Sequence, residues 1–567
     1  MAVGALLGGC HIDLSGLNDL LDAGPTYLNL PGRKIAAGQF SAANVQGSDD
    51  SGAYVIAFTG SPATIAILPF EGGAGCVTGP ANSYPAPFFG PRSTNPFYLP
   101  YLQATKPQTL HFASPTCKEP VAPIVNSGFP LGSSSAFDDP GGFLTLTGTG
   151  QLLFVEPWAS AQPTVVAANA RNPQVVNDKL WAIETAAATA TVPTPTPQLV
   201  ARDLNFKELM RFGSNVKEYA ITGQAETRAV YVDVTNQTAG QTGGDLYVVT
   251  DDMSAPKQID TDACNVLFPG GYQGLGVSYL SPCETRTLVL YGSQSLSQPG
   301  PGKSDTKYVV ADSIIGRPAV AFSGKTGLVF YITNDDATAS NGDLFGGNIG
   351  SAAAEIAQDP QLDRNKTPIL NAQGSEWQAI AQLSQGVGNL IRWKPGVPTR
   401  QIASGVEEVD DSVALVNFDG KVGDLVQIGT TTVSSVFLSG VPAGGIDSNL
   451  SGTNKIGVAV LSDYNGAVGT LMVSPPDTLA FEKAADGVPN TADGFALIGN
   501  LNGVGYLHDF DARTGEGILG VRVIKTGDTF DTGISASEWV EVGWPQPGLL
   551  YVVKNGSDRG IWFSGLK

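Results

Sequence analysis

Acidic and amide side chains gather on one glycine-containing loop of the chain. Asp335, Asp336, Asn341 and Asp343 place four oxygen-bearing side chains close together in the sequence. Hard cations such as Ca²⁺ take about six to eight oxygen ligands from loops of this kind. The spacing is not that of an EF-hand. We expect Ca²⁺ to be the cofactor if there is one, with solvated turn carboxylates as the alternative.

The sequence offers no motif for nucleophilic or nucleotide-dependent catalysis. It contains no G-x-S-x-G, no G-x-x-x-x-G-K-[ST] and no dinucleotide fingerprint in a strand–helix setting. The three histidines, His11, His111 and His508, are too few and too scattered for a haem or a multi-histidine metal centre. We therefore assign no catalytic residue.

The five cysteines predict two disulfides. Cys264 and Cys283 flank a strand–turn–strand segment, so a bridge between them would close a loop of about 20 residues. Cys76 and Cys117 would form the second bridge. Disulfides indicate an exported protein, and this pairing leaves Cys10 over, which in an exported protein requires an explanation.

The residues before Cys10 provide that explanation. The run Leu6-Leu7-Gly8-Gly9-Cys10 resembles the signal box of bacterial lipoproteins. The resemblance implies a lipid on Cys10, contact with the membrane only through this anchor, and a location at the outer membrane, the cell surface or the periplasm. The alternative is an incidental apolar N-terminus. No stretch has the length of a transmembrane helix.

An aromatic, proline-rich segment covers residues 79–107. Proline excludes regular ladder pairing, so we expect an ordered loop packed by its rings. Its aromatic side chains are the residues we predict to contact a partner, because such rings fill partner pockets well; they are Phe88, Phe89, Phe97, Tyr98 and Tyr101. The alternative is that the rings cover the protein's own sheets.

The formal net charge is −20, from 52 acidic and 32 basic residues. Such a surface repels phosphate backbones and anionic membrane faces. We therefore expect no nucleic-acid partner, and a protein or polysaccharide at the cell surface instead.

A short pattern of an apolar β-rich run and a polar or glycine turn repeats in the C-terminal part. Copies begin at Gly388, Gly423, Gly469, Gly505 and Gly548, at intervals of roughly 35 to 46 residues. A sheet of this size cannot bury its own apolar face, so the copies must stack. We count twelve β-rich segments between residues 54 and 567. The run from Ala352 to Ala357 is one of the few helix candidates.

The C-terminal sequence GLLYVVKNGSDRGIWFSGLK has an Asn-Gly turn between two β-rich runs, which is a strong hairpin signal. This form resembles the blades of WD40-like and TolB-type β-propellers. The run from Asp511 to Glu516 is similar to the D-x-x-T-G-E turn that packs blades in quinoprotein-type propellers. The resemblance implies an all-β propeller of about seven or eight four-stranded blades, or two smaller propellers split near residue 190.

The expected organisation is a lipoprotein-like lead over residues 1–50, then a propeller over 51–567 with a Thr/Pro-rich insert at 186–197. The leading hypothesis is a non-enzymatic, surface-tethered binding or scaffold protein that recognises its partner through inter-blade loops. One alternative is an extracellular propeller enzyme that acts on a polysaccharide or small molecule with channel carboxylates. Another is a structural subunit of a surface assembly.

Overall fold

The computed structural model describes residues 32–565 with gaps. The longest gaps are 81–98, 115–122, 132–141, 187–193, 269–275, 294–304 and 334–340. Cys10, Cys117 and most of the Thr/Pro-rich insert therefore lie outside the described residues.

The described elements are antiparallel strands and one short 3₁₀ helix, η5 (Gly499–Leu501). The first four sheets are formed by β2 (Ala42–Asp49), β3 (Gly52–Thr59), β4 (Thr64–Pro69) and β5 (Cys76–Pro80); β6 (Leu99–Gln103), β7 (Thr109–Ala113) and β8 (Ile124–Val125); β9 (Ser127–Leu131), β10 (Phe143–Thr147), β11 (Leu152–Val155) and β12 (Thr164–Ala167); and β13 (Ala170–Val176), β14 (Lys179–Thr185), β15 (Pro197–Arg202) and β16 (Glu208–Phe212).

A seven-stranded sheet follows, and after it come three sheets of four strands each. The seven strands are β17 (Val216–Thr222), β18 (Arg228–Asp233), β19 (Gly244–Val249), β20 (Lys257–Leu267), β21 (Gly276–Leu280), β22 (Leu288–Ser293) and β23 (Asp305–Ala311). The next sheets are β24 (Ile314–Ser323), β25 (Thr326–Thr333), β26 (Asp343–Asn348) and β27 (Ala354–Gln358); β28 (Asn371–Gln373), β29 (Glu376–Ser384), β30 (Val387–Lys394) and β31 (Val397–Val406); and β32 (Glu408–Asp410), β33 (Val413–Val416), β34 (Val422–Gln427) and β35 (Leu438–Pro442).

The last three sheets also have four strands each. They are β36 (Ile446–Asn449), β37 (Gly457–Ser462), β38 (Val468–Ser474) and β39 (Glu482–Pro489); β40 (Phe495–Ile498), β41 (Gly503–Asp511), β42 (Glu516–Val523) and β43 (Thr529–Ala536); and β44 (Glu538–Val542), β45 (Gly548–Val553), β46 (Gly560–Gly565) and β1 (Arg33–Ala37).

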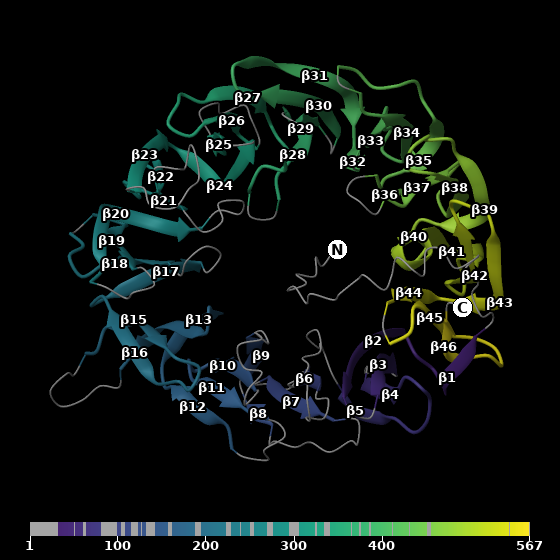
Figure 1. Cartoon of the computed structure of the whole chain (residues 1–567), viewed down its shortest axis with the longest axis horizontal. Helices are drawn as coiled ribbons and strands as arrows, with labels where there is room; N and C mark the ends of the chain where they lie inside the picture. Colours follow the sequence, from purple (N-terminus) through teal and green to yellow (C-terminus); the bar gives the residue numbers. More distant parts are fainter. Residues whose placement is uncertain are drawn as a thin grey trace. The chain divides into compact units, whose positions relative to one another are not determined.

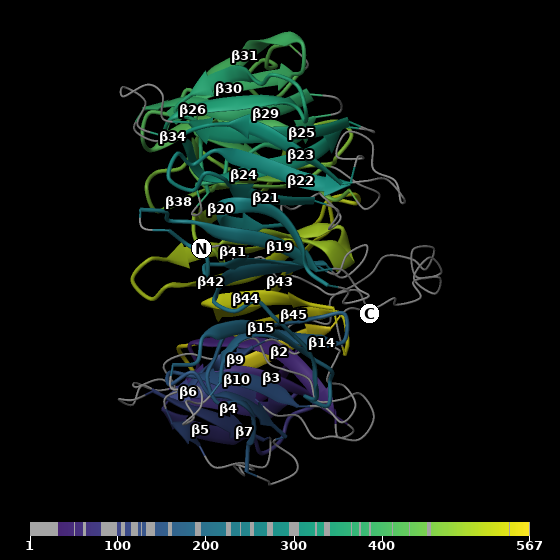
Figure 2. The ribbon, with the colours of Figure 1, turned by 90° about the vertical axis from the view of Figure 1, so that its left-hand side faces the viewer.

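By its contacts the chain divides into two compact units. The longer comprises Gln46–Ile446 and Leu461–Gly466, and the shorter comprises the N-terminal residues up to Val45, Asp447–Val460 and Ala467–Lys567. In the longer unit each sheet lies beside the sheet that follows it in the chain (Figures 1 and 2). In the shorter unit β1 pairs with β46, so the N-terminal strand completes the C-terminal sheet and covers its edge.

Alternate residues of single strands show how the sheets pack. In β18, Ala229 and Tyr231 belong to one apolar cluster, whereas Val230 and Val232 belong to another. Successive side chains of a strand point to opposite faces. One face of β18 therefore packs toward β14–β16 of the preceding sheet, and the other packs toward β21 and β22 at the far end of the same seven-stranded sheet. Both faces are buried, which is why the β-rich runs have apolar residues at consecutive positions. The predicted all-β propeller fold is confirmed.

The described residues form eleven sheets, nine of which have four strands. This number exceeds our estimate of seven or eight blades. The difference lies partly near the N-terminus, where β2–β5, β6–β8, β9–β12 and β13–β16 are separately hydrogen-bonded sheets.

The helix expected at Ala352–Ala357 is wrong. Most of this run lies in β27, which pairs antiparallel with β26. The free edge of β26 provides backbone hydrogen bonds that outweigh the helical preference of alanine, which is the strongest of any residue but amounts to less than about 1 kcal/mol per position. Among the described residues no helix is long and apolar enough to cross a membrane.

Candidate functional site

Strand β20 leaves one group of strands and joins the next. Its first part pairs with β19, and its last part pairs with β21. Asp262 and Asn265 adopt left-handed backbone conformations, with φ of 50° and 54°. These two residues interrupt the regular ladder, so the strand bends between its two partners.

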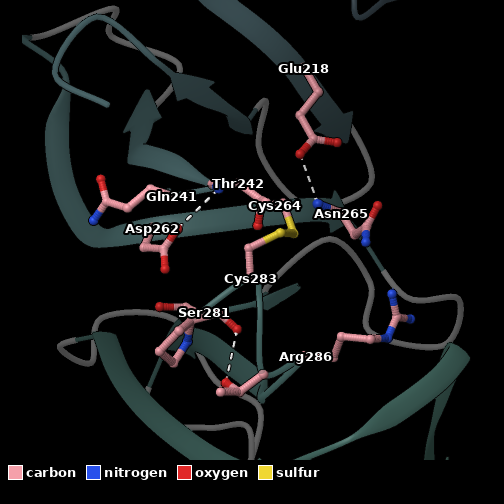
Figure 3. Close-up of a disulfide and its surroundings, with 12 residues drawn as sticks. Glu218, Gln241, Thr242, Asp262, Cys264, Asn265, Ser281, Cys283 and Arg286 are labelled. Atoms are coloured by element: carbon pink, nitrogen blue, oxygen red, sulfur yellow. Dashed lines mark hydrogen bonds between the residues drawn. A yellow bond between two sulfur atoms is a disulfide. The ribbon is translucent and has the colours of Figure 1, made fainter. Parts of the chain in front are cut away.

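A disulfide fixes this bend. Cys264 in β20 is bonded to Cys283 in the turn between β21 and β22, as Figure 3 shows. The backbone N–H of Cys283 donates to the Asp262 carbonyl at 2.9 Å, and the Ser281 hydroxyl donates to the Thr261 carbonyl at 2.9 Å. The predicted Cys264–Cys283 bridge is therefore confirmed.

Arg286 is held at the end of the same turn. Its Nε donates to the carbonyl of Ile314 at 2.6 Å, and the Ile314 N–H donates back to the Arg286 carbonyl at 3.2 Å. These bonds attach the turn to the start of β24. The guanidinium is therefore positioned by the backbone of the following sheet.

Glu218 of β17 approaches from the other side. Its Oε1 accepts a hydrogen bond from the backbone N–H of Asn265 at 2.7 Å, drawn as a dashed line in Figure 3. Burial raises the pKa of the Glu218 carboxyl, and the Asn265 hydrogen bond and the charge of Lys217 oppose this effect. In Figure 3 the Glu218 side chain lies above the disulfide, and the Arg286 side chain lies below it and to the right.

Glu218 and Arg286 line a cavity of about 310 Å³. Leu280 and Leu288 contribute apolar lining, and Gly316–Pro318 of β24 also line the cavity. Arg317 is exposed. The Ser278 side chain is only 1% exposed, and its Oγ has no hydrogen-bond partner among the residues that the structure describes. We call this space the disulfide-side cavity.

Of the other predicted disulfide, Cys76–Cys117, the structure describes only Cys76. Cys76 in β5 is 2% exposed and is disulfide-bonded. Its predicted partner, Cys117, lies outside the described residues, as does Cys10.

The acidic loop is described only in part. Asp335 and Asp336 lie outside the described residues. Asn341 donates from its backbone N–H to Asp359 at 2.7 Å and from Nδ2 to the Pro360 carbonyl at 3.2 Å. Asp343 is 5% exposed, in β26. No group of three or more His, Cys, Asp or Glu able to hold a metal occurs in the described part of the chain. The Ca²⁺ site stays a prediction.

Of the five aromatic residues predicted to bind a partner, only Tyr101 is described. It lies in β6, is 1% exposed, and stacks on His111 with ring centroids 5.1 Å apart. Tyr101 is a core residue and not part of a contact surface, because its strand is buried between sheets. Phe88, Phe89, Phe97 and Tyr98 lie outside the described residues.

Glu218, Ser278, Arg286 and Arg317 belong to no motif that the sequence shows, and none of them was among the predicted site residues. Glu218 precedes its partner Asn265 by 47 positions, and Arg317 comes from a different sheet. The cysteine pair was the only sequence signal near this cavity.

No family model matches the chain, and no curated protein matches its sequence significantly. Solved structures with a partial likeness include a Mycobacterium tuberculosis puromycin-hydrolysing peptidase, at 11% identity and a TM-score of 0.27, with 63% of each chain covered. Another is the β-propeller domain of the Trilobed protease from Pyrococcus furiosus, at 9% and 0.24, covering 56% of this chain and 97% of that one. A third is a eukaryotic initiation factor, at 12% and 0.30, covering 84% and 98%. These likenesses are too low to indicate a function.

Proposed function

We propose that this chain is an exported, non-enzymatic binding protein that recognises its ligand in the disulfide-side cavity. The observation that carries this proposal is the cavity itself, which combines an apolar wall with the convergent polar groups of Glu218, Ser278, Arg286 and Arg317. Ligand sites in proteins have this composition and begin at about 300 Å³. The cavity therefore accommodates a small molecule, or one group of a larger partner such as a surface protein or polysaccharide.

The geometry also favours binding over chemistry. Arg286 is fixed through its Nε and its carbonyl, and Glu218 is fixed through Oε1. Groups held in this way are ready to pair with a ligand without reorganisation, which favours affinity. Glu218 is the only carboxylate among the described residues that line the cavity. A glycosidase mechanism uses two such groups.

Export is supported by the Cys264–Cys283 disulfide, because such bonds persist in oxidising compartments. The lipid on Cys10, the cell-surface or outer-membrane location and the WD40-like or TolB-type form of the blades belong to the same proposal and rest on the sequence resemblances. Intact mass of the protein purified from its native membrane tests the tether. Acylated Cys10 as the first residue is the expected result, and an unmodified mass would remove the lipid anchor from the proposal.

The binding function is tested by thermal unfolding of the purified chain against a panel of amino acids, dipeptides, short carboxylic acids and sugars. A ligand should raise Tm, bind with one-to-one stoichiometry in calorimetry, and be recovered unchanged by mass spectrometry. Arg317→Glu should abolish binding, because it reverses a charge that lines the cavity. The side chain is exposed, so the change should not disturb the core. Conversion of the ligand would contradict a non-enzymatic role, and a panel without any binder would contradict the proposed function.

A further inference from the structure

The disulfide-side cavity carries both signs of charge. Glu218 contributes a carboxylate from β17, while Arg286 and Arg317 contribute guanidinium groups from the turn after β21 and from β24. A simple anion would meet repulsion from Glu218, and a simple cation would meet repulsion from the two arginines. A ligand with separated positive and negative ends complements all three groups.

The fixed groups retain bonding capacity. A carboxylate accepts about four hydrogen bonds and a guanidinium donates about five. Among the described residues, Asn265 uses one acceptor site of Glu218, and Ile314 uses the Nε donor of Arg286. The remaining sites give a ligand charged partners of both signs.

Ser278 provides an independent observation. Its side chain lines the cavity at 1% exposure, and no described residue bonds to its Oγ. Buried hydroxyl groups are nearly always paired, so this hydroxyl points to a polar group supplied from outside the chain. Its position on the same face as Leu280 places a polar contact beside an apolar wall.

We propose that the disulfide-side cavity binds a small zwitterion, a free amino acid or a dipeptide with an aliphatic side chain. The ligand carboxylate pairs with Arg286 and Arg317, its ammonium group pairs with Glu218, and its side chain contacts Leu280 and Leu288. The volume of about 310 Å³ lies at the lower end of ligand sites and suits a molecule of this size. This inference rests on the proposed binding function and names its ligand class.

Calorimetry on the full chain tests the two charges separately. The probes are L-leucine, N-acetyl-L-leucine, which lacks the ammonium group, L-leucinamide, which lacks the carboxylate, and the dipeptide Gly-Leu. We expect L-leucine or Gly-Leu to bind at least about tenfold more tightly than either blocked form. The tighter binder of the two shows whether the ligand is a free amino acid or a dipeptide. Equal binding of a blocked form would overturn the inference, as would no zwitterion binding at millimolar concentration.

Variants connect the charges to the residues. Arg317→Gln should weaken L-leucine about tenfold or more and leave L-leucinamide unchanged, whereas Glu218→Gln should weaken both. Arg513→Gln is the matched control: it removes the same charge from an 84% exposed side chain outside the cavity and should change nothing. Unchanged affinity in Arg317→Gln would also overturn the inference. A non-zwitterionic ligand that binds at the cavity would overturn this inference alone, whereas a panel without any binder would overturn the proposed function as well.

Discussion

Glu218 Oε1 accepts a hydrogen bond from the backbone N–H of Asn265 at 2.7 Å, linking the first strand of the seven-stranded sheet to the point where β20 changes partners. The first strands of other sheets carry the same kind of contact. Glu408 accepts from Gly444 at 2.9 Å, Asp447 from Leu497 at 2.7 Å, and Glu541 from Asn500 at 2.7 Å. These carboxylates satisfy backbone N–H donors of another strand or of a turn next to one.

The raised pKa of Glu218 predicts a pH dependence of stability. Below the ordinary value of 4.5 the carboxyl is protonated in both states. As the pH rises, the unfolded chain ionises first, so the free energy of unfolding falls until the pH exceeds the raised pKa of the folded state. Glu218→Gln does not titrate. Urea unfolding from about pH 4 to 8 should show the wild type losing stability relative to this variant.

Asp419 is the control of opposite sign. Hydrogen bonds from the backbone N–H groups of Val422 and Lys421 lower the pKa of its carboxyl. Its contribution is present above the ordinary value of 3.8 and is lost as the pH falls through the lowered pKa. Parallel pH profiles for Glu218→Gln and Asp419→Asn would contradict the assignment.

Removing the Cys264–Cys283 bridge should destabilise the longer unit. The bonded residues are 19 positions apart, and closing a loop of this length contributes roughly 3 kcal/mol through the unfolded chain. We expect the double variant Cys264→Ala with Cys283→Ala to lose about this amount in urea unfolding. The double variant removes only this disulfide, whereas a reductant would also break the disulfide of Cys76. An unchanged midpoint would mean that hydrogen bonds alone fix the turn.

Arg202 and Glu184 form a bidentate ion pair between β15 and β14. Nε donates to Oε1 at 2.9 Å and Nη2 to Oε2 at 2.6 Å, and the side chains are 14% and 7% exposed. Glu184→Gln leaves the guanidinium with only the more distant and more exposed Glu208 carboxylate, at 3.8 Å, so we expect a loss of about 3 kcal/mol in urea unfolding.

Two comparisons make this prediction specific. The double variant Arg202→Met with Glu184→Leu should be nearly neutral, because it removes both buried charges. Asp486→Asn breaks the pair with Lys483, whose side chains are 62% and 56% exposed, and should cost less than about 1 kcal/mol. A loss in Glu184→Gln no larger than in Asp486→Asn would refute the prediction.

Glu516, the last residue of the D-x-x-T-G-E run, connects β42 to the turn after β45. Its carboxylate accepts from the backbone N–H of Lys554 at 2.7 Å, from the N–H of Asn555 at 3.1 Å and from Asn555 Nδ2 at 2.9 Å. Glu516→Ala should lower the free energy of unfolding of the shorter unit by roughly 1 to 3 kcal/mol, since it removes three hydrogen bonds made by a carboxylate that is only 7% exposed. Glu482→Ala, at a 72% exposed side chain, is the control and should have little effect in the same measurement.

Much of the fold follows from local sequence. Runs such as Val230-Tyr231-Val232 predict strands because β-branched and aromatic residues suit a pleated surface. The D-x-x-T-G-E resemblance anticipated that Glu516 packs neighbouring sheets, and the cysteine spacing anticipated the Cys264–Cys283 bridge. Ala354–Gln358 became a strand against its local preference because β26 offers a free edge.

The sequence alone determined the strand content, one disulfide and the need for sheets to stack, because these depend on local patterns and on the insolubility of apolar faces. Only the tertiary structure decided the number of sheets, the burial of Tyr101 and the meeting of Glu218, Ser278, Arg286 and Arg317 around one cavity. These features depend on which distant strands pair and pack, and the local sequence pattern around a residue does not specify its neighbours in space.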